Sequence, residues 1–290
     1  MKYRIEHLTQ YDYSQEVSAS HHLARLKPMT GEGQDVLEFE MEVEPEPADV
    51  RISRDYFGNE VQRFALQELH TSLKVKTTSL VTVSGEDVGL VSLPWTAVRD
   101  EVRVQGSRDY PDACEYVFAS GVVPVGREFA NYASRFFKDG TPVLEGAREL
   151  TRAIYEEFSF DPTATTVSTP VATVLRKKKG VCQDFAHFQI ACLRSIGLPA
   201  RYVSGYVRTE PPPGQPRMQG ADATHAWVSV YCPGLGWTEF DPTNDLVPTD
   251  THVRLAYGRD FSDISPLRGT VVGGGGQQLT IGVTMTPMEE

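Results

Sequence analysis

The sequence contains little cysteine and has no long apolar run. Only 4 of its 290 residues are cysteines, and none stands in a Cys-x-x-Cys pair or at a zinc-finger interval from a histidine, so we expect no metal site and no cofactor. No apolar segment approaches the roughly 18 residues that a membrane-spanning helix needs, and the N-terminus lacks the apolar core of a signal peptide. We therefore expect a cytoplasmic protein with reduced cysteines and no membrane partner.

Basic residues are scarce relative to acidic ones. The chain has 28 lysines and arginines against 39 aspartates and glutamates, which gives a net charge of −11. Nucleic acids and anionic membranes repel an acidic protein, so neither is expected as the main partner. A hydrophobic content of 40% is enough for real cores, and 290 residues suit one large or two modest domains.

The first 88 residues show the alternation of apolar and polar positions that is typical of β-strands. Residues 36–43 alternate strictly, residues 73–83 continue the pattern, and Pro45 and Gly58 are among the residues that separate the strands. We expect residues 1–88 to form an N-terminal antiparallel β-sandwich or small barrel. Residues 89–290 are expected to form a second domain, the core of the chain.

Helical patterns occupy the middle of the chain. Apolar residues recur every three or four positions in 126–138 and in 143–158, and again in a helix from Gln183 to Ile196. Several strand patterns follow, which predicts an α+β core in which the helix after Cys182 packs on an antiparallel sheet. Between two of these strands, the proline-rich segment 210–219 is expected to border the active site.

Cys182 stands at the start of that helix, after the basic run 176–179 and Gly180. Free backbone N–H groups and the positive end of the helix dipole favour an anion there, so we expect the pKa of the thiol to fall below the roughly 8.5 of a free cysteine. A thiolate near neutral pH is a nucleophile, whereas most lone cysteines are small buried hydrophobic residues. Asp184 is expected to cap free N–H groups, and His187 to face away from Cys182.

A hairpin pattern downstream supplies a base for this cysteine. The stretch THAWVSVYCPGLGWTEFDPT shows two alternating strands around a Pro-Gly-Leu-Gly turn, and we expect Val230 to pair with Gly236. That register sets His225 opposite Asp241, with Cβ atoms roughly 5 Å apart, so the carboxylate can hold an imidazole N–H. With Cys182 the pair fills the nucleophile, base and orienter roles of a papain-type triad.

Two stretches resemble a known family. GVCQDFAHFQIACLRSIGLPARYVSGYV and THAWVSVYCPGLGWTEFDPTND are similar to the core of the bacterial transglutaminase-like superfamily, whose members include cysteine peptidases and acyl transferases. HLTQYDYSQEV, RLKP and DYFGNEV resemble the N-terminal β domain that accompanies this core. GRDFSD resembles the family's C-terminal segment, and its charged residues are expected to pin a loop. The resemblance implies a papain-like fold and assigns the catalytic positions to Cys182, His225 and Asp241.

These residues predict acyl transfer through a thioester on Cys182. With water as acceptor, the enzyme is a cysteine protease or amidase that acts on a peptide or protein substrate; with a primary amine, it is a protein-glutamine transglutaminase that forms cross-links. We expect hydrolysis, because no acyl-acceptor site can be recognised, and a non-catalytic binding or scaffold protein is the remaining alternative. The backbone N–H of Cys182 is the first candidate oxyanion donor. Further candidates for the oxyanion site or the walls of the cleft are Gln183, Tyr206 and Trp227.

Overall fold

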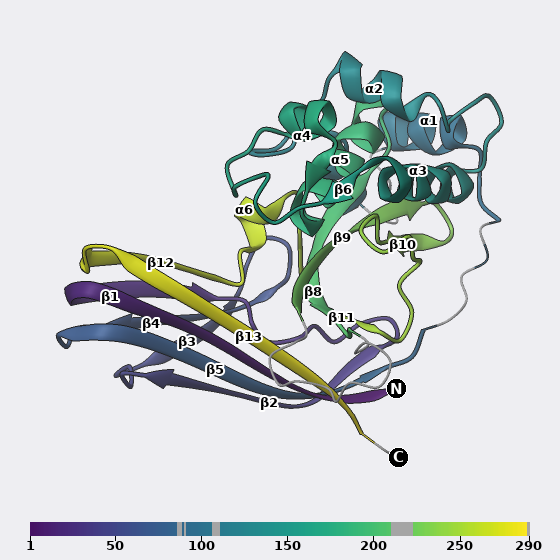
Figure 1. Ribbon diagram of the computed structural model, residues 1–290. Helices are drawn as coiled ribbons and strands as arrows, with labels where there is room; N and C mark the ends of the chain where they lie inside the picture. Colours follow the sequence, from purple (N-terminus) through teal and green to yellow (C-terminus); the bar gives the residue numbers. More distant parts are fainter. Residues whose placement is uncertain (86–88, 90, 106–110, 210–222, 289–290) are drawn as a thin grey trace, which may run out of the picture.

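The computed structural model describes residues 1–85, 89, 91–105, 111–209 and 223–288. It divides into a long curled sheet and a compact helical part that sits on one end of that sheet (Figure 1). The segment 210–219, which was expected to border the active site, lies outside the described residues.

The curled sheet is antiparallel and has seven strands. They are β1 (Lys2–Ala24), β2 (Gln34–Glu44), β3 (Val50–Arg54), β4 (Glu60–Leu66), β5 (His70–Val83), β12 (Leu267–Gly273) and β13 (Gln277–Met288). β1 is 23 residues long; its first half pairs with β5 and β13, and its second half pairs with β4 and β12. Alternate residues of β5 are buried, as a strand with one face in a core requires. Because strands twist, a sheet built on so long a strand curls around that core.

The last two strands change the expected division of the chain. β12 and β13 follow the strands of the compact helical part in sequence but pair with β1, as Figure 1 shows. Residues 267–288 therefore belong to the sheet of the N-terminal part and not to the core in which 89–290 had been placed together. The alternation of apolar and polar residues could not reveal this, because it is the same whichever sheet a strand joins.

The compact part consists of helices on a four-stranded antiparallel sheet of order β10-β9-β8-β11. The helices are α1 (Trp95–Gln105), the 3-10 helix η1 (Pro111–Val117), α2 (Arg127–Ala133), α3 (Val143–Glu157), α4 (Val171–Lys177), α5 (Cys182–Ser195) and α6 (Phe261–Ile264). The strands are β8 (Ala200–Val207), β9 (Ala223–Cys232), β10 (Gly236–Phe240) and β11 (His252–Gly258). A short parallel pair joins β6 (Ser159–Phe160) to β7 (Lys179–Gly180).

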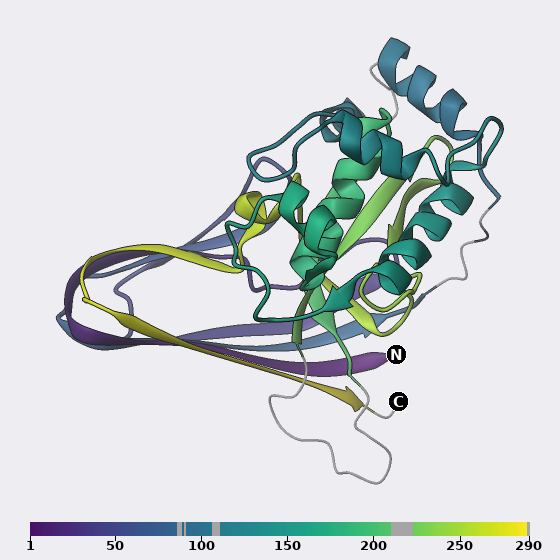
Figure 2. The ribbon, with the colours of Figure 1, turned by 45° about the horizontal axis from the view of Figure 1, so that its top comes forward.

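Helix α5 is the centre of this part. It packs on β8 and β9 and is surrounded by α2, α3 and α4 (Figure 2). From Asp184 to Arg194 every residue of α5 is buried, and the strands contribute the apolar face that alternation predicted, which includes Ala226, Val228 and Val230. The expected α+β class, with the helix that begins at Cys182 packed on an antiparallel sheet, is confirmed.

The two parts meet where β1, β5 and β13 cover the β8 and β11 edge of the smaller sheet. An apolar cluster fills this interface with residues from both sides. Its buried members are Tyr3, Ile5, Val81, Val83, Tyr206, Val253, Leu255, Val283 and Met285. The β part is therefore packed directly against the strand that follows α5 and against β11.

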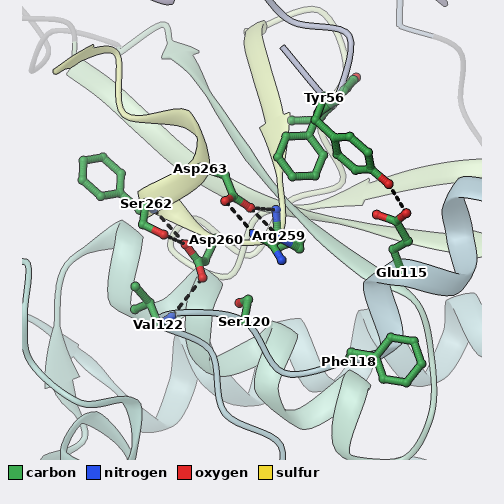
Figure 3. Close-up of polar contacts among 12 residues, drawn as sticks. Tyr56, Glu115, Phe118, Ser120, Val122, Arg259, Asp260, Ser262 and Asp263 are labelled. Atoms are coloured by element: carbon green, nitrogen blue, oxygen red, sulfur yellow. Dashed lines mark hydrogen bonds and ion pairs between the residues drawn. The ribbon is translucent and has the colours of Figure 1, made fainter. Parts of the chain in front are cut away.

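The segment after β11 pins loops, as expected for GRDFSD. Asp260 is fully buried; its carboxylate caps α6 by accepting the Ser262 N–H at 2.8 Å and also accepts the Val122 N–H at 2.9 Å (Figure 3). Arg259 forms an ion pair with Asp263 at 2.9 Å. These contacts tie the loop before α2 to the end of β11.

Candidate active site

Cys182 is the first residue of α5, where the sequence predicted it, and its side chain is half-buried. Asp184 holds the backbone that leads into this helix. Its carboxylate accepts the Val181 N–H at 2.9 Å and the Thr165 hydroxyl at 2.7 Å, and a β-carbon on Gly180 would lie 2.6 Å from the same oxygen. Asp184 thus satisfies the backbone just before the helix, in line with its expected capping role, while Gly180 leaves room for it.

His225 and Asp241 lie together on the face of the sheet away from most of α5. Nε2 of His225 is 2.8 Å from Oδ2 of Asp241. The histidine is 7% exposed and the aspartate fully buried. The carboxylate therefore holds one nitrogen of the imidazole and leaves Nδ1 as the nitrogen that can exchange a proton with a thiol.

The register of the hairpin differs from the expected one by two residues. Gly236 pairs with Cys232 and not with Val230, so the ladder ends with Phe240 opposite Val228. A three-residue loop with positive φ at Gly234 (78°) makes the tighter turn possible. An even shift keeps every side chain on its face, which is why His225 and Asp241 still meet although they are not directly opposed.

The Asp241 carboxylate dominates the electrostatics of the site. Burial lowers the pKa of His225, but the charge of Asp241 and its hydrogen bond, together with a hydrogen bond and a charge interaction with Cys182, outweigh burial and raise the pKa to about 10. For Asp241, burial raises the pKa, whereas His225 and His252 outweigh it and bring the pKa well below the usual range. The site therefore favours an imidazolium held between a carboxylate and the sulfur of Cys182.

Two further side chains that the sequence analysis did not single out contact Asp241. Oδ2 accepts hydrogen bonds from Asn244 Nδ2 at 2.7 Å and from His252 Nε2 at 3.1 Å, and Oδ1 accepts the Thr243 N–H at 2.9 Å. Asn244 stands three residues after the aspartate, so the turn Asp-Pro-Thr-Asn could have indicated it. His252 begins β11, at the other edge of the sheet, and no local pattern points from it to Asp241.

Trp227 is a support for the two histidines rather than a wall of an open cleft. Its ring is fully buried, with centroids 5.9 Å from His225 and 5.1 Å from His252, and its Nε1 donates to Glu239 at 2.9 Å. The indole crosses β8 at Gly205, where a β-carbon would overlap the ring. The expectation that Trp227 borders substrate is therefore corrected, because neighbouring side chains and β8 cover its ring completely and leave no surface for a substrate.

The expected role of Tyr206 is also corrected, whereas the role of Gln183 at the oxyanion site stays a prediction. Tyr206 is fully buried between the two parts of the molecule, with its hydroxyl 2.8 Å from His7 Nδ1, so it has no surface for a substrate. Gln183 is half-buried beside Cys182. His187 is buried in the core, accepts the Phe261 N–H at 3.1 Å, and has a pKa lowered to about 4 by burial. It therefore has the structural role that its position on the helix predicted.

The described residues contain one grouping that could offer three ligands to a metal ion. Ligand atoms of His225, Asp241 and His252 lie within 4.8 Å of one another. The Nε2 atoms of both histidines converge on one carboxylate oxygen, Oδ2 of Asp241, through the hydrogen bonds given above. Those hydrogen bonds account for the arrangement, and we interpret it as a network that orients His225.

Comparison with known proteins adds family matches to this geometry. A family model described as the bacterial transglutaminase-like N-terminal region matches residues 3–82, and a model described as the transglutaminase-like superfamily matches residues 130–242. The second match contains Cys182, His225 and Asp241. The first covers strands of the curled sheet.

Individual relatives extend the match over nearly the whole chain. A Mycobacterium tuberculosis protein, described as uncharacterized, is 38% identical over 279 residues, which are 93% of this chain and 87% of that protein. A protein-glutamine gamma-glutamyltransferase of Pseudomonas aeruginosa is 31% identical over 107 residues, which are 34% of this chain and 16% of that protein. A candidate cysteine protease of Cytophaga hutchinsonii shares the fold, with a TM-score of 0.76 at 22% identity over 100% of this chain and 91% of that chain.

None of the described helices combines the length and the apolar composition that are needed to cross a bilayer.

Proposed function

This chain belongs to the transglutaminase-like superfamily, and on that premise we propose that it is a cysteine hydrolase that cleaves amide bonds of peptides or proteins through a thioester on Cys182. The observation that carries the proposal is the His225 and Asp241 pair, 2.8 Å apart, whose imidazole interacts with the cysteine that begins α5. A nucleophile, a base and an orienter on separate elements are the arrangement that covalent acyl transfer needs.

The first half of the reaction forms the thioester. The Cys182 thiolate attacks the carbonyl carbon of the amide, and the developing oxyanion is stabilised by backbone N–H groups at the start of α5, with that of Cys182 as the first donor. Nδ1 of His225 gives its proton to the amide nitrogen, the C–N bond breaks, and the amine leaves. Asp241 keeps the imidazole oriented and stabilises its charged form.

The second half returns the enzyme to its starting state. His225 is now neutral and accepts a proton from water, whose oxygen attacks the thioester carbonyl. The C–S bond breaks, the carboxylic acid leaves, and the proton on His225 restores the imidazolium beside the Cys182 thiolate. Atoms and charges balance without a cofactor.

A second candidate is transfer of the acyl group to a primary amine. The relative that favours it is the Pseudomonas aeruginosa protein-glutamine gamma-glutamyltransferase, whose match includes 34% of this chain. An amine would replace water in the second step, with His225 as the same base, and the product would be an isopeptide. We place hydrolysis first because no described residue forms a recognisable site for an acceptor amine.

The two candidates separate in one assay. Casein and a glutamine-containing peptide are incubated with the protein, with and without a fluorescent primary amine, and the products are identified by mass spectrometry. New peptide ends or deamidated glutamine in both conditions support hydrolysis, and incorporation of the amine supports transfer. Cys182→Ala must abolish either product. Cys114→Ala, which changes a half-buried cysteine outside the site, is the matched control and must not.

We also propose that the protein works in the cytoplasm. All four cysteines are unpaired, which agrees with the reduced cytoplasm expected from the sequence. Cell fractionation with an antibody against the full chain tests this directly.

A further inference from the structure

We propose that His252 is a positioning residue for the reaction: it holds Asp241 in place, and β11 connects it to the β part of the molecule. The inference rests on the proposed function and adds to it a role for the curled sheet. The Asp241 carboxylate, which orients His225, is then positioned partly by β11, the edge strand of the four-stranded sheet opposite to β10. The following contacts carry the argument.

The position of Asp241 is not fixed by the β9–β10 ladder. The ladder ends at Phe240 and Val228, and Asp241 lies one residue beyond it, where it forms an isolated backbone bridge to Leu246 with N–O distances of 2.8 and 3.2 Å. Its side chain must therefore be held by other groups. Asn244 belongs to the same turn as Asp241. Among the described residues, His252 is therefore the one donor to this carboxylate oxygen that lies outside the β9–β10 hairpin and its turn.

The hydrogen-bond partners of His252 suit this task. Its Nδ1 is 3.0 Å from the Thr251 hydroxyl, and its Nε2 is 3.1 Å from Oδ2 of Asp241. A hydroxyl that donates to Nδ1 leaves the proton of a neutral imidazole on Nε2, which is the nitrogen that faces the carboxylate. His252 is only 2% exposed, so water does not compete for either nitrogen. The residue therefore presents a fixed N–H to Asp241.

The strand that carries His252 is held by the β part. β11 is the last strand of its sheet, so one of its edges pairs with no strand among the residues that the structure describes. Two amide side chains cover this edge. Gln34 accepts the Arg254 N–H at 2.8 Å and donates to the Arg254 carbonyl at 2.9 Å, and Asn59 accepts the Tyr257 N–H at 2.9 Å and donates to its carbonyl at 2.8 Å.

These two amides act like a neighbouring strand. Each is only 1% exposed and pairs with both polar groups of one backbone residue, which is how a strand would satisfy an edge. The Met29 N–H adds a second hydrogen bond to the Arg254 carbonyl at 2.9 Å. Because Gln34 and Asn59 lie in the part before residue 88, removal or displacement of that part would take these hydrogen bonds away from β11, the strand that carries His252.

The test is the rate of alkylation of Cys182 by iodoacetamide in the full chain, followed by mass spectrometry from pH 5 to pH 9, which needs no substrate. His252→Phe removes the donor, and we expect a rate at neutral pH at least about tenfold lower, with the rise of the profile moved to higher pH. His252→Gln, whose amide can still donate, must recover most of the loss. His252→Asn, which is too short to reach Asp241, must be slow and serves in place of the Phe variant if that variant does not fold.

His7 provides the matched control, because it is also a buried histidine that forms a long-range hydrogen bond, in its case with the Tyr206 hydroxyl. His7→Phe must change thermal stability without moving the alkylation profile. Wild-type rates in His252→Phe or His252→Asn overturn the inference while the proposed function stands. A wild-type Cys182 that is alkylated no faster than Cys114 contradicts the proposed function itself. Gln34→Ala combined with Asn59→Ala should slow alkylation with every histidine in place, and an unchanged rate in that folded variant contradicts the role of β11.

Discussion

Oδ2 of Asp241 lies 2.8 Å from Nε2 of His225, although the hairpin ladder, which pairs Phe240 with Val228, would place the aspartate opposite Trp227 if it continued. The pair is thus made diagonally, by side chains that reach across two positions. Diagonal neighbours are held less firmly by the backbone than opposed ones. The surrounding donors to Asp241 therefore help to hold the imidazole of His225 in one orientation.

Asp241→Asn should remove catalysis while keeping the shape of the site. An amide cannot stabilise the imidazolium of His225 and favours the wrong tautomer, so we expect kcat to fall by roughly 10³- to 10⁴-fold. Turnover of the substrate found with the wild type measures this. Glu239→Gln is the control, since Glu239 binds the Trp227 indole on the same face without contact to His225, and an equal loss in that variant would contradict the assignment of Asp241.

Asp241→Ala should in addition destabilise the fold. It leaves the buried histidines His225 and His252 and the amide of Asn244 without their shared acceptor, and the loss of one partner from a buried charged network costs about 3–5 kcal/mol. Urea unfolding measures the free energy. A loss below about 1 kcal/mol, the scale of an exposed ion pair, would show that the network contributes little.

The stability of the protein should decrease as the pH rises above neutrality because of His225. Its pKa is about 10 in the folded protein, against roughly 6.5 in an unfolded chain. The folded state keeps a proton that the unfolded state releases, so this contribution is complete below about pH 6.5 and is lost as the pH approaches 10. Urea unfolding of wild type and His225→Gln between pH 6 and pH 10 should show a difference that shrinks with pH. A difference in unfolding free energy between the two proteins that stays constant from pH 6 to pH 10 would contradict this contribution of His225.

Gly205→Ala should reduce both stability and activity. The new β-carbon would overlap the Trp227 ring and the Val253 carbonyl, so the indole that packs between His225 and His252 must move. Overpacking of this kind costs about 1–3 kcal/mol. Thermal unfolding and the alkylation rate of Cys182 measure the two effects. Gly234→Ala is the comparison, because its β-carbon would contact nothing although its φ is positive, and it should lower stability without changing alkylation.

The sequence predicted the parts of the site that depend on local pattern. The start of α5 at Cys182 follows from the basic run, the glycine and the apolar periodicity. The shared face of His225 and Asp241 follows from alternation, and it survived an error of two residues in register because that shift is even. The register itself depended on how tightly the glycines of the turn could bend the chain.

The features that the sequence could not predict all depend on long-range packing. β12 and β13 alternate like any strand, so their return to β1 is a matter of topology. His252 reaches Asp241 because the chain crosses from β10 to the far edge of the sheet. Large aromatic residues in strands are consistent with either a cleft or a core, and both Trp227 and Tyr206 proved to be fully buried.

The most direct test of the account is to trap the acyl group on the enzyme. The full chain is mixed with p-nitrophenyl acetate near neutral pH, quenched with acid within seconds, and mapped by mass spectrometry. We predict a burst of one equivalent of nitrophenol and one acetyl group on Cys182, absent in Cys182→Ala and much slower in His225→Ala. Acetyl groups spread over Cys114 and Cys232 as readily as over Cys182, or a rate unaffected by His225→Ala, would contradict a thioester mechanism at this site.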